Sequence, residues 1–194
     1  MVKMDTRKIT FVTMMAALGN VLFLISFHLG PIAPGVAFDF SLTTTFIAAF
    51  YGGPILGLVT GLFVGLFPGI YFGPLGTGAW LGLVGLPIGK ALTGLTAGLL
   101  AKKLDLGVKG RSSLLAAPVV LLAYVPECLF TVAYFTYLMP YFIGGGGFGT
   151  LFFILPKAWV EIIIIGVLMA ALVGNYGFIS FINRFFAAAK NPQD

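Results

Sequence analysis

The chain has 194 residues, of which 59% are hydrophobic and 9% charged, with a formal net charge of +5. Soluble domains carry about 25% charged residues, so the composition excludes a soluble globular protein and indicates an integral membrane protein. One cysteine and one histidine exclude an internal disulfide and the usual multi-His or multi-Cys metal sites. The basic residues do not cluster as a nucleic-acid-binding surface requires.

Apolar runs predict an all-α integral membrane protein with six transmembrane helices in a single domain, residues 1–194. A spanning helix needs about 20 apolar residues. The first run, Ile9–Leu29, is longer than the apolar core of a secretory signal, so we interpret it as a retained helix. The predicted spans are approximately 9–29, 36–51, 55–67, 79–101, 114–139 and 151–173.

The second and third predicted helices have features of their own. Asp39 lies near the start of the second helix, where a carboxylate can complement the helix dipole. In the third, glycines recur at every fourth position, which predicts close packing against a neighbouring backbone. The Gly/Pro-rich segment Pro68–Gly78 is predicted to leave the helix as a loop. The glycines of this ladder are Gly53, Gly57, Gly61, Gly65, Gly69 and Gly73.

Lysine and arginine outside the predicted spans fall on one side only. They precede the first helix, lie between the fourth and fifth, and follow the sixth, whereas the loops after the first, third and fifth helices have none. Because basic residues stay on the cytoplasmic side, we expect both termini to be cytoplasmic. These basic positions are Lys3, Arg7, Lys8, Lys102, Lys103, Lys109, Arg111, Arg184 and Lys190.

Ionisable residues inside the predicted spans are the main functional signal. Lys90, Glu127, Lys157 and Glu161 lie in the middle to outer half of the membrane, counted at about 1.5 Å per residue. A charge at the bilayer centre costs at least about 2.5 kcal/mol on insertion scales. These residues therefore either neutralise one another as a structural network or line a polar cavity that holds a small solute.

The fifth and sixth helices favour the cavity. One helical face carries the polar residues Tyr124, Glu127, Thr131 and Tyr134. Prolines at positions 87, 126 and 156 come shortly before ionisable residues, and helices bend at proline. Lysine before glutamate is the weaker order for an i,i+4 pair. We therefore expect the stretch 157–161 to act less as a self-contained ion pair than as one cavity wall, with Lys157 the first candidate for solute contact.

Three stretches have a recognisable pattern. The basic entry Thr6–Ile9 leads into Met15–Leu18, the segment Thr45–Gly65 is rich in glycine, and Pro87–Gly98 places a lysine before a glycine-rich stretch. They resemble the start of the first helix, the second and third helices, and the fourth helix of the substrate-binding S components of energy-coupling factor (ECF) vitamin and micronutrient transporters. The resemblance covers nearly the whole chain.

The resemblance implies a binding subunit, not an enzyme, in a prokaryotic plasma membrane. Such a subunit captures a small solute from outside and docks on a transmembrane coupling subunit driven by two ATPase subunits, which hydrolyse ATP, so no cofactor is expected on this chain. Segments Gly30–Asp39 and Pro68–Gly78 would be lids. The solute would contact Lys157, Glu127, Glu161, Lys90, Tyr124, Thr131, Tyr134 and Asp39.

The family's docking motif pairs two alanines on the first helix, and this chain departs from it. The nearest candidates are Thr13 with Ala17 and Ala16 with Asn20. Two other functions remain open: a stand-alone ion- or proton-coupled transporter using Glu127 or Glu161, and a membrane assembly protein that packs through the glycine ladder.

Overall fold

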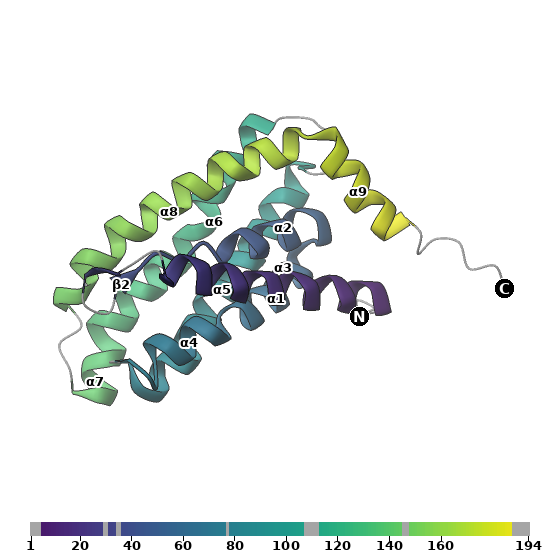
Figure 1. Cartoon of the computed structure of the whole chain (residues 1–194). Helices are drawn as coiled ribbons and strands as arrows, with labels where there is room; N and C mark the ends of the chain where they lie inside the picture. Colours follow the sequence, from purple (N-terminus) through teal and green to yellow (C-terminus); the bar gives the residue numbers. More distant parts are fainter. Residues whose placement is uncertain are drawn as a thin grey trace.

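The computed structural model describes residues 5–28, 31–33, 36–76, 78–106, 113–144 and 148–187. These residues form a helical bundle with one short antiparallel strand pair (Figure 1). In chain order the elements are α1 (Thr6–His28), β1 (Pro31–Ala33), β2 (Val36–Ala37), α2 (Leu42–Gly52), α3 (Pro54–Val64), α4 (Leu66–Phe72), α5 (Ala79–Lys103), α6 (Ser113–Ala133), the π-helical turn η1 (Tyr134–Leu138), α7 (Met139–Ile143), α8 (Phe148–Gly174) and α9 (Tyr176–Ala187).

The helices run along the long axis of the bundle. The start of α1 and helix α9 lie at one end, and α7, β2 and the tip of α4 lie at the other (Figure 1). We name these the α9 end and the α7 end. The predicted orientation would put the α9 end in the cytoplasm and the α7 end outside.

Five helical stretches are long and apolar enough to cross a membrane: Thr6–His28, Pro54–Phe72, Ala79–Lys103, Ser113–Ile143 and Phe148–Gly174. The remaining predicted span, the second in chain order, corresponds to α2, which has 11 residues. At about 1.5 Å per residue it is roughly half as long as the hydrocarbon core is thick. The all-helical membrane fold is confirmed, whereas six complete spans and cytoplasmic termini stay predictions.

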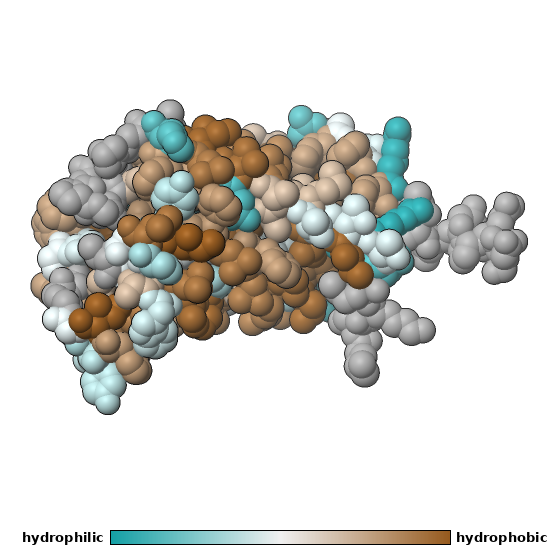
Figure 2. All heavy atoms as spheres, turned by 60° about the horizontal axis from the view of Figure 1, so that its bottom comes forward, coloured by the Kyte–Doolittle hydropathy of each residue, from teal (hydrophilic) through white to brown (hydrophobic). Residues whose placement is uncertain are grey.

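Much of the exterior of the bundle is apolar. On the face drawn in Figure 2, hydrophobic residues cover the middle and more polar residues lie toward the two ends. Several large apolar side chains on the surface are half or more exposed, including Ile163 and Val167 of α8 and Leu129 of α6. Lipid tails are the solvent that such a surface requires, because monomeric soluble proteins rarely expose large continuous apolar patches.

The second predicted helix begins six residues later than expected. Residues 36–37 pair in a strand and residues 38–40 are not helical, so Asp39 precedes α2 and does not lie within it. The carboxylate of Asp39 accepts a hydrogen bond from the backbone N–H of Ser41 at 2.9 Å. Such local bonds compete with helix formation, and non-helical backbone is tolerated at depth where protein surrounds it.

The predicted loop at Pro68–Gly78 is helical over its first half, so that prediction is wrong for residues 68–72. Helix α4 begins at Leu66 after a short break at Gly65. Pro68 is therefore in the first turn of α4, where proline removes no intrahelical donor. Helices α3 and α4 together make the 19-residue apolar stretch Pro54–Phe72.

The glycine ladder packs α3 against α5 of the same chain. A Cβ placed on Gly57 would overlap the carbonyl of Gly94, and one on Gly61 would overlap the carbonyl of Lys90. The groove predicted from the sequence is confirmed. The hypothesis that the ladder packs against another protein is wrong, because this face is buried against α5 inside the bundle.

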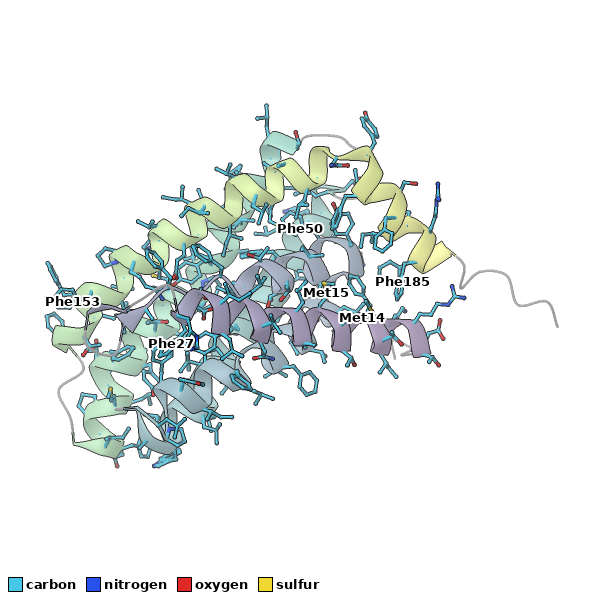
Figure 3. The ribbon with its side chains drawn as sticks, in the orientation of Figure 1. Met14, Met15, Phe27, Phe50, Phe153 and Phe185 are labelled. Atoms are coloured by element: carbon cyan, nitrogen blue, oxygen red, sulfur yellow. The ribbon has the colours of Figure 1, made fainter. Side chains whose placement is uncertain are left out.

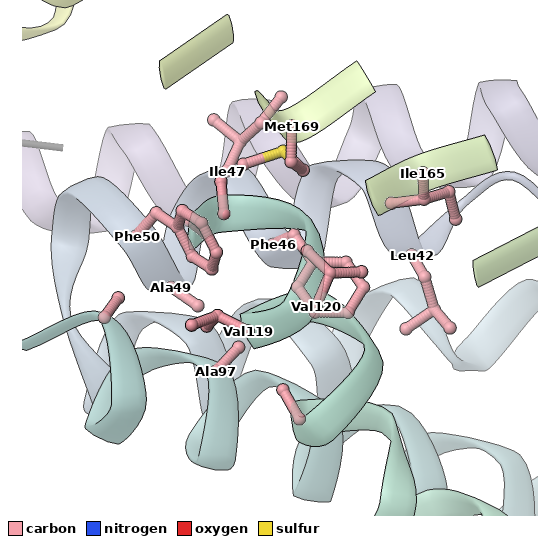
Figure 4. Packing of buried hydrophobic residues seen from close by; sticks show 14 of the residues in the cluster. Leu42, Phe46, Ile47, Ala49, Phe50, Ala97, Val119, Val120, Ile165 and Met169 are labelled. Atoms are coloured by element: carbon pink, nitrogen blue, oxygen red, sulfur yellow. The ribbon is translucent and has the colours of Figure 1, made fainter. Parts of the chain in front are cut away.

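The apolar core lies between the ladder and α8. Phe46 and Phe50 of α2 pack with Val120 of α6 and Met169 of α8 (Figure 4). At the α9 end, Phe185 lies against Phe11 of α1, with ring centroids 5.8 Å apart (Figure 3). Helix α9 therefore closes the core from the side opposite to the cavity described next.

Candidate solute site

A cavity of about 160 Å³ lies within the bundle toward the α7 end. Its walls come from the segment around Asp39 and from α5, α6, η1 and α8. Every residue that the sequence predicts for solute binding lines it: Lys157, Glu127, Glu161, Lys90, Tyr124, Thr131, Tyr134 and Asp39. The structure thus brings the predicted residues together, from segments far apart in the chain.

Lys90 lines the cavity and is held there by two hydrogen bonds. Its ammonium lies 2.7 Å from Oδ2 of Asp39 and donates a second hydrogen bond, also at 2.7 Å, to Oγ of Ser41. Only 3% of Lys90 is exposed. Asp39 therefore neutralises Lys90. The sequence predicts it near the start of the second helix, but it lies three residues before Leu42 and is not in the first turn of α2.

Lys157 and Glu161 form an ion pair within α8, with Nζ and Oε1 3.1 Å apart. Both residues line the cavity, as expected. They also pair with each other, contrary to the expectation drawn from their order in the sequence. Oε1 of Glu161 also accepts a hydrogen bond from the backbone N–H of Asp39. This second bond ties α8 to the non-helical segment before α2 and compensates for the weaker order of the pair.

Glu127 differs from the other carboxylates of the cavity. Its Oε2 accepts a hydrogen bond from the hydroxyl of Thr93 on α5. Among the described residues it makes no ion pair, since the two salt bridges there join Lys90 to Asp39 and Lys157 to Glu161. Glu127 is half-buried and lines the cavity.

Aromatic rings form much of the cavity wall toward the α7 end. The ring of Tyr134 packs onto α5 at Gly85, where a Cβ would lie 2.6 Å from Cε2 of the tyrosine. Tyr134 opens the π-helical turn η1, and π-turns are frequent at functional sites. Pro140 accounts for this turn, because its ring lacks an N–H and crowds the carbonyl four residues earlier. The rings that line the cavity are Phe72, Tyr124, Phe130, Tyr134 and Phe135.

Sequence reasoning missed several of these contacts. Ser41 and Thr93 hold Lys90 and Glu127, and their spacing of two and three residues from Asp39 and Lys90 was the available signal. Phe130 and Phe135 lacked any signal, because phenylalanines occur throughout the apolar runs. Trp159 lies outside the cavity and packs edge-on against Tyr124, with centroids 5.4 Å apart.

The two candidate docking pairs on α1 have different surroundings. Thr13 and Ala17 are exposed. Ala16 is buried, and the amide of Asn20 donates to the carbonyls of Ala16 at 2.9 Å and Phe63 at 3.1 Å. The pair Ala16 and Asn20 therefore faces the bundle and is wrong as a docking surface.

The two segments predicted as lids are partly described. Ala37 and Phe72 line the cavity, as does Gly78. Residues 29–30, 34–35 and 77 lie outside the described residues. A lid role for these segments stays a prediction.

Comparison with known proteins supports the fold. No family model and no curated protein matches the chain. A solved structure of the S component of a bacterial ECF transporter matches with a TM-score of 0.53, over 97% of this chain and 100% of the other, at 20% identity. The chain is therefore a multi-pass membrane protein with the fold of an ECF S component.

Proposed function

We propose that this chain is the substrate-binding subunit of an ECF-type importer in a prokaryotic plasma membrane. It captures a small vitamin-like or micronutrient solute from outside and has no enzymatic activity of its own. The observation that carries the proposal is the cavity toward the α7 end, where polar groups from α5, α6 and α8 converge. Intramembrane ionisable groups that face a cavity are functional by default.

Delivery of the solute requires partners in this proposal. A transmembrane coupling subunit docks on the exposed face of α1 at Thr13 and Ala17, and two ATPase subunits hydrolyse ATP. The hydroxyl of Thr13 donates to the carbonyl of Ile9 at 3.0 Å. Because that hydroxyl is satisfied within its own helix, the face offers a smooth surface for another helix.

Solute binding is tested on the purified protein. Small molecules released from it by heat are identified by mass spectrometry, and their affinity for the stripped protein is measured. We expect Lys157→Ala and Glu127→Ala to abolish binding, whereas Asp105→Asn, which removes an exposed carboxylate outside the cavity, keeps it. If both alanine variants kept full affinity but unfolded at a lower temperature, the charges would form a structural network and would not bind solute.

A stand-alone proton-coupled transporter is the second candidate, favoured by Glu127, which has no ion-pair partner among the described residues. Uptake into proteoliposomes that contain this chain alone, abolished by an uncoupler, would support it. The ECF-type proposal expects no such uptake. It expects ATP-dependent uptake in cells that is lost in Ala17→Trp but kept in Ala171→Trp, an equally bulky change at another exposed alanine.

A further inference from the structure

The charged side chains that line the cavity do not balance. Two ammonium groups face three carboxylates when all are ionised, which leaves one formal negative charge. The five groups are Lys90, Lys157, Asp39, Glu127 and Glu161. An uncompensated charge is costly within a membrane protein, so one further positive charge beside these described groups would be favourable.

The pairing identifies where that positive charge belongs. Lys90 already donates to Asp39 and Ser41, and Lys157 is paired with Glu161. Glu127 accepts a hydrogen bond from the hydroxyl of Thr93 and makes no ion pair with another described residue. A cation at Glu127 would neutralise the cavity without breaking either existing pair.

An anionic solute would meet the opposite situation. An anion beside Lys157 or Lys90 would compete with Glu161 or Asp39 for the ammonium, and it would raise the cavity's negative charge. Breaking a buried ion pair leaves an uncompensated charge, which is strongly unfavourable. The existing pairs therefore select against a carboxylate or phosphate.

The surroundings of Glu127 suit a cation on a flat apolar body. Gly89 lies opposite its side chain, where a Cβ would be 3.3 Å from Cγ of Glu127. Tyr124 stands one helical turn before Glu127, and Phe130 and Tyr134 extend the aromatic wall. Ring faces attract cations, and rings also stack on flat ligands.

We propose that the solute is a small organic cation of charge +1, a protonated amine or a cationic nitrogen heterocycle, whose charged group pairs with Glu127. Its apolar or aromatic part lies against Tyr124, Phe130 and Tyr134. The inference rests on the proposed function, since it names the class of solute that the same cavity takes.

The charge of the solute is tested by fractionation. Small molecules released by heat from protein purified from its native membranes are separated at pH 7 on cation- and anion-exchange columns. Each fraction is returned to stripped protein, and the midpoint of thermal unfolding is measured. We expect the stabilising fraction to be the one retained by the cation exchanger. A stabilising fraction that is anionic, neutral or zwitterionic would overturn this inference and leave the binding subunit intact.

The role of Glu127 is tested with Glu127→Gln, which keeps the shape of the side chain and removes its charge. Removing one member of a charge pair at a binding site weakens binding strongly, so we expect the affinity for the cationic fraction to fall at least about thirtyfold. Asp105→Asn is the matched control and keeps wild-type affinity. Unchanged affinity in Glu127→Gln would overturn the pairing, and stabilisation of the wild type by no fraction would overturn the proposed function itself.

Discussion

The residues that decide this site are charged side chains held inside an apolar bundle. Lys90 and Asp39 illustrate the balance, because each alone would be a charge removed from water. Their 2.7 Å contact, together with the hydrogen bond from Lys90 to Ser41 and that from the Ser41 N–H to Asp39, satisfies both groups. Such a pair adds little net stability, but it holds the segment before α2 against α5.

Removing one member of this pair is expected to be strongly destabilising. Lys90→Met leaves the carboxylate of Asp39 buried without a cation, so we expect the free energy of unfolding to fall by about 3–5 kcal/mol. Unfolding of the purified protein in detergent, followed by circular dichroism, measures this change.

The double variant Lys90→Met with Asp39→Asn supplies the control. Asparagine keeps an oxygen that can accept the Ser41 N–H, and no uncompensated charge remains, so much of the lost stability should return. A double variant no more stable than Lys90→Met would show that the two residues are not coupled.

At the level of elements, the packing of α3 on α5 sets the position of Lys90 in the wall of the cavity. Gly61 contacts the backbone of Lys90 itself, and Gly65 contacts the backbone of Pro87 one turn earlier. Because two backbones meet without side chains between them, the position of Lys90 along the bundle is set by the ladder. The ladder therefore serves the cavity through packing.

A methyl group in this contact should loosen it. We expect Gly61→Ala to lower the free energy of unfolding by about 1–3 kcal/mol, as overpacking of a close contact does, and to weaken solute binding because Lys90 moves. Gly149→Ala is the matched control in α8, where no described residue beyond the helix's own adjoining backbone lies within 4 Å of the added carbon. There alanine should be neutral or stabilising by up to about 1 kcal/mol, since it is the better helix former. Equal effects of both substitutions on unfolding would contradict the packing role of Gly61.

For the whole molecule, the polarity of its two ends decides how the cavity is filled. The cavity lies toward the α7 end, and the basic residues Lys102 and Lys103 end α5. If the positive-inside rule holds, the solute enters from outside and α9 lies at the cytoplasmic surface.

This orientation is tested by labelling introduced cysteines in a Cys128→Ser background. Leu75, after α4, and Leu104, after α5, are exposed leucines in turns. We expect a membrane-impermeant maleimide to label Leu75→Cys in intact cells and Leu104→Cys only after lysis. The reverse pattern would show that the protein has the opposite orientation in the membrane. Labelling of both cysteines from outside would contradict the prediction that α5 crosses the membrane.

The sequence by itself determined what depends on local chemistry. The long apolar runs predicted the spans, because each must satisfy its backbone inside lipid. The charges within them marked the cavity residues, because lipid makes each charge costly. The four-residue glycine spacing likewise predicted a close helix contact, although not its partner.

Only the tertiary structure decided which groups meet. Asp39 pairs with Lys90, 51 residues away, and its N–H bonds Glu161, 122 residues away. No local pattern encodes these distances, because they depend on how each helix is rotated and which helices are neighbours. The same contacts hold residues 38–40 out of the helix that their sequence predicted. They leave Glu127 as the cavity carboxylate that makes no ion pair among the described residues.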